Sequence, residues 1–197
     1  MSNNTENATY VMRHVIAALV MNEPGVLAQV AGMFAARGFN IDSLVVGRTE
    51  NPELSRMTIV VNGDNAVLEQ VRKQLGKLVP VVKVVDYSHV PFVERDLVLV
   101  QVNAPSGKRG ELMELANIFR AKIVDVSPDR MMMELSGTED KIVAFIELLR
   151  PYGIVEMART GVIAMPRGAN TGYRPKAGTP APEPQTPEID PGDLPPG

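Results

Sequence analysis

Apolar residues recur along this chain at two alternating spacings, which predict strands that alternate with helices. The apolar run 15–21 predicts a strand, and Gly38 is a natural stop for the helix that follows it. A helix is expected at 26–37, with its apolar residues at helical spacing: Val26, Val30, Met33 and Phe34. The remaining elements of this half are strands at 41–46, 57–61 and 81–87 and a helix at 66–78. The order βαββαβ is the ferredoxin-like arrangement.

The second half of the chain repeats this order. Its expected strands are 97–102, 123–126, 131–135 and 154–157, with a further short candidate at 162–165, and its expected helices are 111–119 and 140–149. Arg56-Met57 recurs as Arg130-Met131, and Gly63 recurs as Gly137 at the same offset, which favours duplication of the fold. The sequence therefore predicts an α+β protein with two tandem ferredoxin-like βαββαβ domains.

Proline usage indicates where the folded part ends. Half of the 16 prolines lie beyond Gly172, in a stretch with little apolar content, so we expect residues 169–197 to form a disordered tail. The expected division of the chain is a flexible N-terminus at 1–11, an N-terminal domain at 12–88, a linker at 89–94 and a C-terminal domain at 95–168.

Both faces of the first strand are apolar. One face carries Val15, Ala17, Leu19 and Met21, and the other carries Ile16, Ala18 and Val20. Right-handed crossovers place both helices of a βαββαβ unit on one face of its sheet, so the other face needs a partner. The partner could be the second domain or a second copy. We favour self-association, because the short linker at 89–94 limits docking between the domains.

Composition excludes several classes of function. The net charge of −3 gives no reason to expect nucleic acid or a membrane surface as partner. The absence of cysteine excludes disulfides, thiolate metal sites and cysteine nucleophiles. No signal peptide or membrane span is legible, so a soluble cytoplasmic protein is expected. His14 and His89 lack a patterned carboxylate or serine, and the acidic residues lack metal-ligand spacing. We therefore expect no catalytic residue, no metal site and no cofactor in this chain.

The turn Asn22-Glu23-Pro24-Gly25-Val26-Leu27 is the best candidate for a binding site. Backbone N–H groups at a helix start attract a carboxylate, and a glycine there allows close approach of a ligand. The side-chain oxygen of Asn22 could cap the helix. An ordinary strand-to-helix turn has the same spacing, and it remains the alternative. Asn40 and Ile41 could likewise be only a helix stop and a strand start.

The segment RHVIAALVMNEPGVLAQVAGMFAARGFNIDSLVVGRTENPELSRMTIVV closely resembles the N-terminal ACT domain of the small, regulatory subunits of acetohydroxyacid synthase (acetolactate synthase). The similarity extends through LEQVRKQLGKLVPVVKVVD and, more loosely, to IFRAKIVDVSPDRMMMELSGTEDKI and ARTGVIAMPRG, so it covers about 12–168. The run RGFNIDSL followed by LSRMTIVV is specific to that family, whereas NEPGVL is generic to ACT domains.

This resemblance implies a subunit without catalytic activity that binds the thiamine-diphosphate-dependent large subunit. It implies activation of that enzyme and feedback inhibition by a branched-chain amino acid, commonly valine. Thiamine diphosphate, Mg²⁺ and FAD would reside in the large subunit. Two ACT domains would pair as a homodimer, with the effector at their interface. The matching positions are Asn22, Gly25, Val26 and Leu27 from one subunit and Asn40 and Ile41 from the other.

Ala28 departs from the family pattern, which often has a hydroxyl residue beside the ligand. The departure bears on effector affinity more than on ligand class. Two other classes of function remain as alternatives. An amino-acid-binding transcription factor would need a DNA-binding helix pair and a basic patch, and neither is legible. An enzyme on the same fold would need convergent titratable groups, which two isolated histidines do not supply.

Overall fold

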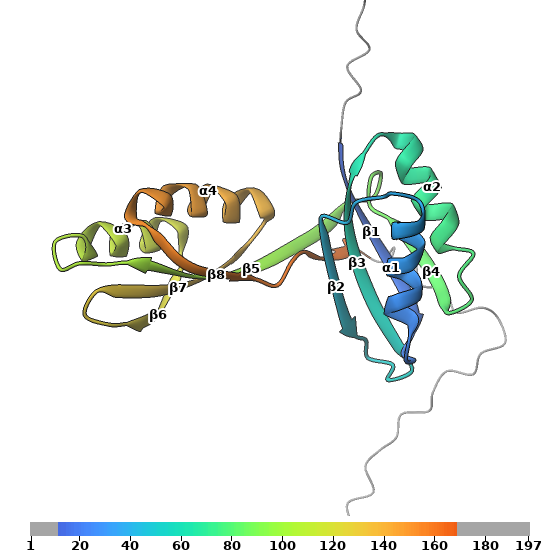
Figure 1. Ribbon diagram of the computed structural model, residues 1–197, viewed down its shortest axis with the longest axis horizontal. Coiled ribbons are helices and arrows are strands. Elements are labelled where there is room, and N and C mark those ends of the chain that lie inside the picture. Colours follow the sequence, from blue (N-terminus) through green and yellow to red (C-terminus); the bar gives the residue numbers. More distant parts are fainter. Residues whose placement is uncertain (1–11, 169–197) are drawn as a thin grey trace, which may run out of the picture.

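The computed structural model describes residues 12–168, which form two α+β halves joined by a narrow connection (Figure 1). The expectations for 1–11 and 169–197 lie outside the described residues. The N-terminal half contains β1 (Met12–Met21), α1 (Val26–Ala36), β2 (Ser43–Arg48), β3 (Leu54–Gly63), α2 (Asn65–Leu75) and β4 (Val81–Asp86). Its antiparallel sheet has the order β2-β3-β1-β4.

The C-terminal half repeats this topology. It contains β5 (Phe92–Asn103), α3 (Arg109–Phe119), β6 (Lys122–Val126), β7 (Arg130–Gly137), α4 (Glu139–Leu149), a 3₁₀ turn (Arg150–Tyr152), β8 (Ile154–Arg159) and β9 (Ile163–Pro166). The sheet order β6-β7-β5-β8 matches that of the first half, strand for strand. The predicted pair of ferredoxin-like βαββαβ units is therefore confirmed.

Each half has its own apolar core between its sheet and its helices. In the first core, the apolar residues predicted for α1 are all buried against alternate residues of β1 and β3: Val26, Val30, Met33, Phe34, Ile16, Ala18, Val20, Met57, Ile59 and Val61. In the second, Ile142, Phe145, Ile146 and Leu149 of α4 are buried as predicted. The Phe119 and Phe145 rings, 5.1 Å apart, join α3 to α4.

The connection between the halves differs from the expected linker. Strand β5 begins at Phe92, so residues 92–94 belong to a strand and not to a loop. Its first four residues pair with β9, from Phe92 with Pro166 to Arg95 with Ile163. We call these two paired segments, 92–95 and 163–166, the ribbon. The sequence pattern missed the early start of β5 because its partner strand is four residues long and lies about 70 positions away.

The ribbon lies against the face of the N-terminal sheet that is turned away from α1 and α2, which we call the outer face. Val15, Ala17, Val60 and Tyr87 of the N-terminal half are buried there with Val162 and Ala164, and Phe92 packs against them. Each of these six buried residues is at most 4 % exposed. The expectation that a short linker keeps the halves from covering each other is therefore wrong for this end of the sheet, because the ribbon reaches across.

Candidate ligand-binding turn

The turn between β1 and α1 contains one residue, Gly25, in a backbone conformation that favours glycine. Gly25 precedes α1 with φ 85° and ψ −11°, which is the left-handed region. Glycine adopts this conformation without the clash that a Cβ would cause. A Cβ placed on Gly25 would meet no atom of the chain within 4 Å, so the space beside it is open. The turn thus combines a fixed backbone with room for a small group to approach.

Asn22 does not cap α1, contrary to the prediction. Its side-chain amide donates to the carbonyl of Pro52 at 2.9 Å, and its side-chain oxygen accepts from Ser55 Oγ at 3.1 Å. No side chain caps this helix. The reason is spatial: the end of the β2–β3 turn lies beside Asn22 and takes its hydrogen bonds. Asn22 therefore fastens the candidate turn to the start of β3.

The start of α1 is consequently free to bind an anion. Gln29 N–H donates to the Gly25 carbonyl at 3.0 Å, which is the first full turn of the helix. The N–H groups of Leu27 and Ala28 have no hydrogen-bond partner in the described part of the chain. The first turn of α1 also has no acidic residue, whereas those of α3 and α4 do. The positive end of the α1 dipole is therefore not offset by a carboxylate of the chain's own first turn.

The two aliphatic residues of the turn point in different directions. Val26 is 4 % exposed and belongs to the core, so its side chain is not available to a ligand and only its backbone N–H is. Leu27 is 47 % exposed at the helix start. Of the two, Leu27 is the residue that can contact an aliphatic ligand.

Asn40 and Ile41 lie at the opposite end of α1, between that helix and β2. Asn40 is exposed, and Ile41 packs partly against the core. The helix has 11 residues, so it separates these two residues from the turn by about 16 Å at 1.5 Å per residue. One amino-acid ligand cannot bridge that distance within a single chain. The six candidate residues form one site only if a second copy supplies Asn40 and Ile41.

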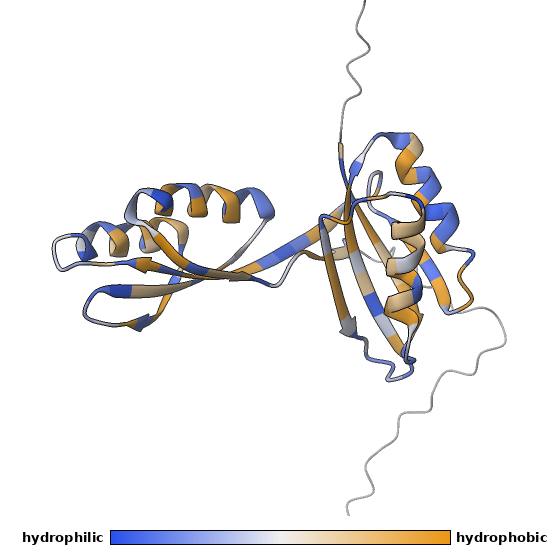
Figure 2. Cartoon of the chain, in the orientation of Figure 1, coloured by the Kyte–Doolittle hydropathy of each residue, from blue (hydrophilic) through white to orange (hydrophobic). Residues whose placement is uncertain are grey.

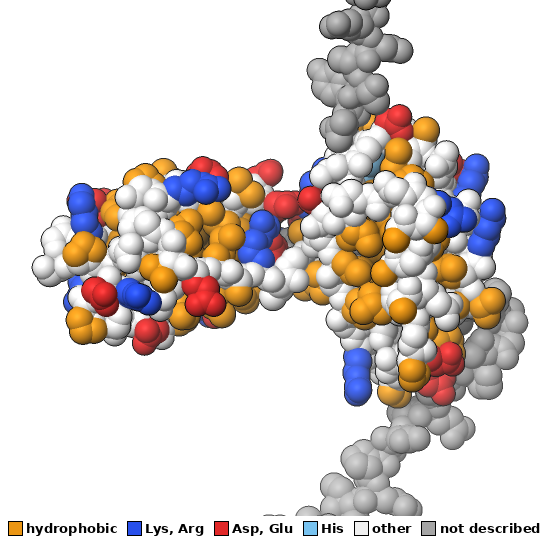
Figure 3. Space-filling view, in the orientation of Figure 1, with side chains coloured by type: hydrophobic (Ala, Val, Ile, Leu, Met, Phe, Trp, Pro, Cys, Tyr) orange, Lys and Arg blue, Asp and Glu red, His pale blue; other side chains and the backbone are white. Residues whose placement is uncertain are grey.

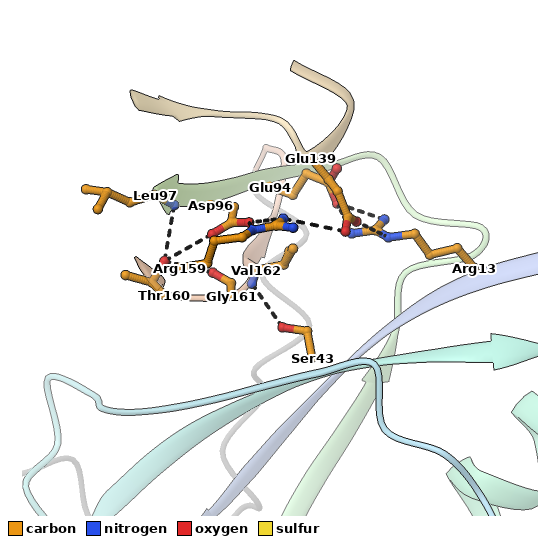
Figure 4. A network of polar contacts seen from close by, with 10 residues as sticks. All are labelled: Arg13, Ser43, Glu94, Asp96, Leu97, Glu139, Arg159, Thr160, Gly161 and Val162. Carbon is orange, nitrogen blue, oxygen red and sulfur yellow. Dashed lines mark hydrogen bonds and ion pairs between the residues drawn. The ribbon is translucent and has the colours of Figure 1, made fainter. Parts of the chain in front are cut away.

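A polar network joins the two halves beside the ribbon (Figure 4). Arg13 of β1 contacts Glu94 of β5 at 3.1 Å and Glu139 at the start of α4 at 2.5 Å. Arg159 pairs with the fully buried carboxylate of Asp96 and also approaches Glu139 at 3.7 Å. Sequence reasoning missed these residues, because partners so far apart along the chain leave no local pattern.

The network borders a cavity of about 370 Å³ between the halves, with Asp42, Ser43, Glu139, Arg159 and Thr160 among its walls. The backbone N–H of Val162 donates to Ser43 Oγ at 3.3 Å across it. Arg159, the cation in this wall, is already paired with two carboxylates. The cavity therefore offers a carboxylate ligand less than the start of α1 does.

Neither a group of metal-binding side chains nor a membrane-spanning helix is found between residues 12 and 168. No group of three or more His, Asp or Glu side chains in that range could hold a metal ion. No helix there is long and apolar enough to cross a bilayer.

Comparison with known proteins identifies relatives of the whole described range. A family model described as the small subunit of acetolactate synthase matches residues 95–168, and one described as the AHAS small subunit-like ACT domain matches residues 16–83. A probable acetolactate synthase small subunit of Archaeoglobus fulgidus is 60 % identical over 157 residues, which cover 80 % of this chain and 98 % of the relative. The acetolactate synthase small subunit of Aquifex aeolicus is 52 % identical over 158 residues, covering 80 % and 82 %.

A solved structure agrees with these matches. The crystal structure of the acetolactate synthase small subunit from Thermotoga maritima is 44 % identical and superposes with a TM-score of 0.73. The alignment covers 80 % of this chain and 98 % of that one. The family expected from the sequence resemblance is thereby confirmed.

Proposed function

Since this chain belongs to the family of acetolactate synthase small subunits, a regulatory role beside a large catalytic subunit follows, and we propose its two components. The chain activates the thiamine-diphosphate-dependent large subunit, and it confers feedback inhibition by a branched-chain amino acid, with valine as the first candidate. We assign thiamine diphosphate, Mg²⁺ and FAD to the large subunit. The observation that carries the effector proposal is the uncapped start of α1 beside the open space at Gly25.

The chemistry of the turn suits an α-amino acid. The free N–H groups of Leu27 and Ala28 and the helix dipole would hold its carboxylate. The exposed side chain of Leu27 would contact its aliphatic part. The ammonium group would be met by Asn oxygens, from Asn22 on one side and from Asn40 of a second copy on the other. Charge-assisted hydrogen bonds of this kind contribute about 1.5–3 kcal/mol each.

The surface beside the turn supports a homodimer. Most of the exposed residues of α1 are small or apolar, namely Leu27, Ala28, Gly32, Ala35 and Ala36, and Gln29 is the polar residue among them. Figure 2 shows α1 as apolar over most of its length, whereas α2 alternates between apolar and polar, and Figure 3 shows apolar side chains gathered on the face that α1 occupies. The neighbouring strand β2 is an edge strand with one unpaired side. A second copy packed along α1 and β2 would bring its Asn40 and Ile41 toward the candidate turn.

Reconstitution with the cognate large subunit tests the proposal. The purified chain alone is expected to form no acetolactate from pyruvate, and addition of the chain is expected to raise the large subunit's rate several-fold. Valine, leucine and isoleucine are then titrated into the complex and into the large subunit alone. An unchanged rate at saturating small subunit overturns the activating role. Equal sensitivity of the complex and the large subunit to all three amino acids overturns the feedback role.

A further inference from the structure

The outer face of the N-terminal sheet is used only in part by the chain itself. Strand register places Arg13, Val15, Ala17, Leu19 and Met21 of β1 on this face in order. The ribbon buries Val15 and Ala17 near the start of the strand. Leu19 and Met21, toward the candidate turn, are half-buried. The covered and the open ends form one continuous surface.

At the covered end, the chain shows which chemistry this face accepts. Apolar residues of the C-terminal half, Val162 and Ala164, fill the sheet surface. Carboxylates of Glu94 and Glu139 meet the cation of Arg13 at the margin. At its covered end, the outer face therefore binds an apolar segment that is flanked by acidic side chains.

At the open end, the cationic side chains are those of two other residues. Arg56 of β3 and Lys83 of β4 are the cross-strand neighbours of Leu19 on its two sides. Both are half-buried, and neither forms a salt bridge within residues 12–168. The outer-face positions of β1 to β4 contain no acidic residue to pair with them.

A shallow hollow lies between these cations. Its lining residues are Ala17, Leu19, Arg56, Lys83, Val85, Tyr87 and Pro166. Because Pro166 is the last residue of the ribbon, the hollow begins where the ribbon ends. The Tyr87 hydroxyl donates to the Ala164 carbonyl at 3.2 Å, and burial raises the pKa of Tyr87 while nearby Arg56 opposes that rise. Neither cation has a carboxylate partner within residues 12–168, so a surface that brings carboxylates to these half-buried side chains gains from binding.

We propose that this open end, made of Leu19, Met21, Arg56 and Lys83, is a docking surface for the large catalytic subunit. The partner segment is apolar and carries carboxylates, and it lies beside the ribbon as a continuation of the contact that the ribbon makes. The proposal rests on the regulatory function proposed above. A second copy of this chain is the less suitable occupant, because an isologous contact through this patch would bring its cations against themselves.

Charge reversal at the patch tests the proposal. The variant is Arg56→Glu with Lys83→Glu, and the matched control is Lys77→Glu with Arg130→Glu, which makes the same charge change at exposed positions off this face that also form no salt bridge within residues 12–168. The concentration of small subunit that half-activates the large subunit is measured for each, at low and at high salt. The patch variant is expected to need at least tenfold more protein, and the control is expected to stay within a factor of about two, well below the tenfold step of 1.4 kcal/mol.

Further variants and measurements separate the possible outcomes. Circular dichroism checks that each variant is folded, and the neutral variant Arg56→Gln with Lys83→Gln removes the two charges without introducing carboxylates. The charge-conserving variant Arg56→Lys with Lys83→Arg is expected to bind the large subunit as wild type does. A folded patch variant that activates like the control overturns the inference. A patch variant with normal affinity but a smaller oligomer, measured by light scattering, also overturns it, because the occupant is then a second copy. If wild type itself neither binds nor activates the large subunit, the proposed function fails, and this inference fails with it.

Discussion

The substitution Gly25→Asp tests the effector site most directly, and Gly25→Asn is its matched control. Both residues have nearly the same shape, and both must adopt the left-handed conformation at φ 85°. That conformation costs a non-glycine residue about 1–2 kcal/mol, with Asp and Asn among the most tolerant. No atom of the chain lies within 4 Å of the added Cβ, so no further loss of stability is expected. The two variants should therefore unfold at similar temperatures, slightly below wild type.

Their affinities for the effector should differ, because only one carries a charge. Two like charges 4 Å apart repel by about 4 kcal/mol at an effective dielectric constant of about 20. Solvent at this exposed turn reduces that value, and we expect about 1.5–3 kcal/mol between the variants. The Asp variant should accordingly bind valine at least tenfold more weakly than the Asn variant. It should still activate the large subunit, since Gly25 lies outside the proposed docking patch.

Calorimetric titration of valine, leucine and isoleucine into wild type and both variants measures the difference. Thermal unfolding, followed by circular dichroism, checks that all three are folded. If the folded Asp variant binds the same amino acid as the Asn variant within a factor of about two, far less than the tenfold step of 1.4 kcal/mol, then the carboxylate of the ligand does not lie at this helix start.

Three other predictions concern the rest of the chain. Truncation after Gly168 should leave folding, large-subunit activation and feedback inhibition intact, because the removed sequence has no core-forming pattern; loss of activation in the reconstituted complex would contradict this. Arg13→Ala should lower the free energy of unfolding by about 1–3 kcal/mol, since it leaves Glu139 without the cation at 2.5 Å. The control Arg72→Ala removes an exposed ion pair within α2 and should lower the free energy of unfolding by less than about 1 kcal/mol. Equal effects of the two substitutions in urea unfolding would show that the network between the halves is not stabilising. Phe145→Ala should cost about 3–5 kcal/mol, since its ring is fully buried against Phe119, and a change below 1 kcal/mol would contradict the packing described.

The sequence was most informative where structure follows from local periodicity. The helical spacing of Ile142, Phe145 and Leu149 identified the buried side of α4, because one face of a helix meets the core at that spacing. The Pro24-Gly25 pair indicated a turn, and the glycine does adopt a positive φ. In both cases, neighbours in sequence determine the outcome.

The rest depended on residues far apart along the chain. Asn22 has cap chemistry, but Pro52 and Ser55 reach its side chain first, and that proximity exists only once β1 and β3 have paired. The pairing of Arg13 with Glu139 likewise requires both halves to be folded. The residues of the candidate effector site follow from the family resemblance, and their assignment to two subunits remains a prediction.

The ribbon has a consequence for how the protein is made. Tyr87, on the outer face, is covered only when Ala164 has been synthesised, and 77 positions separate the two residues. A ribosome that adds about 5–20 residues per second needs about 4–15 s to synthesise that interval. During this time the N-terminal sheet can form, but Val15, Ala17 and Val60 stay open to solvent. The nascent chain therefore exposes an apolar surface until β9 emerges, and during this interval a chaperone would have most to protect.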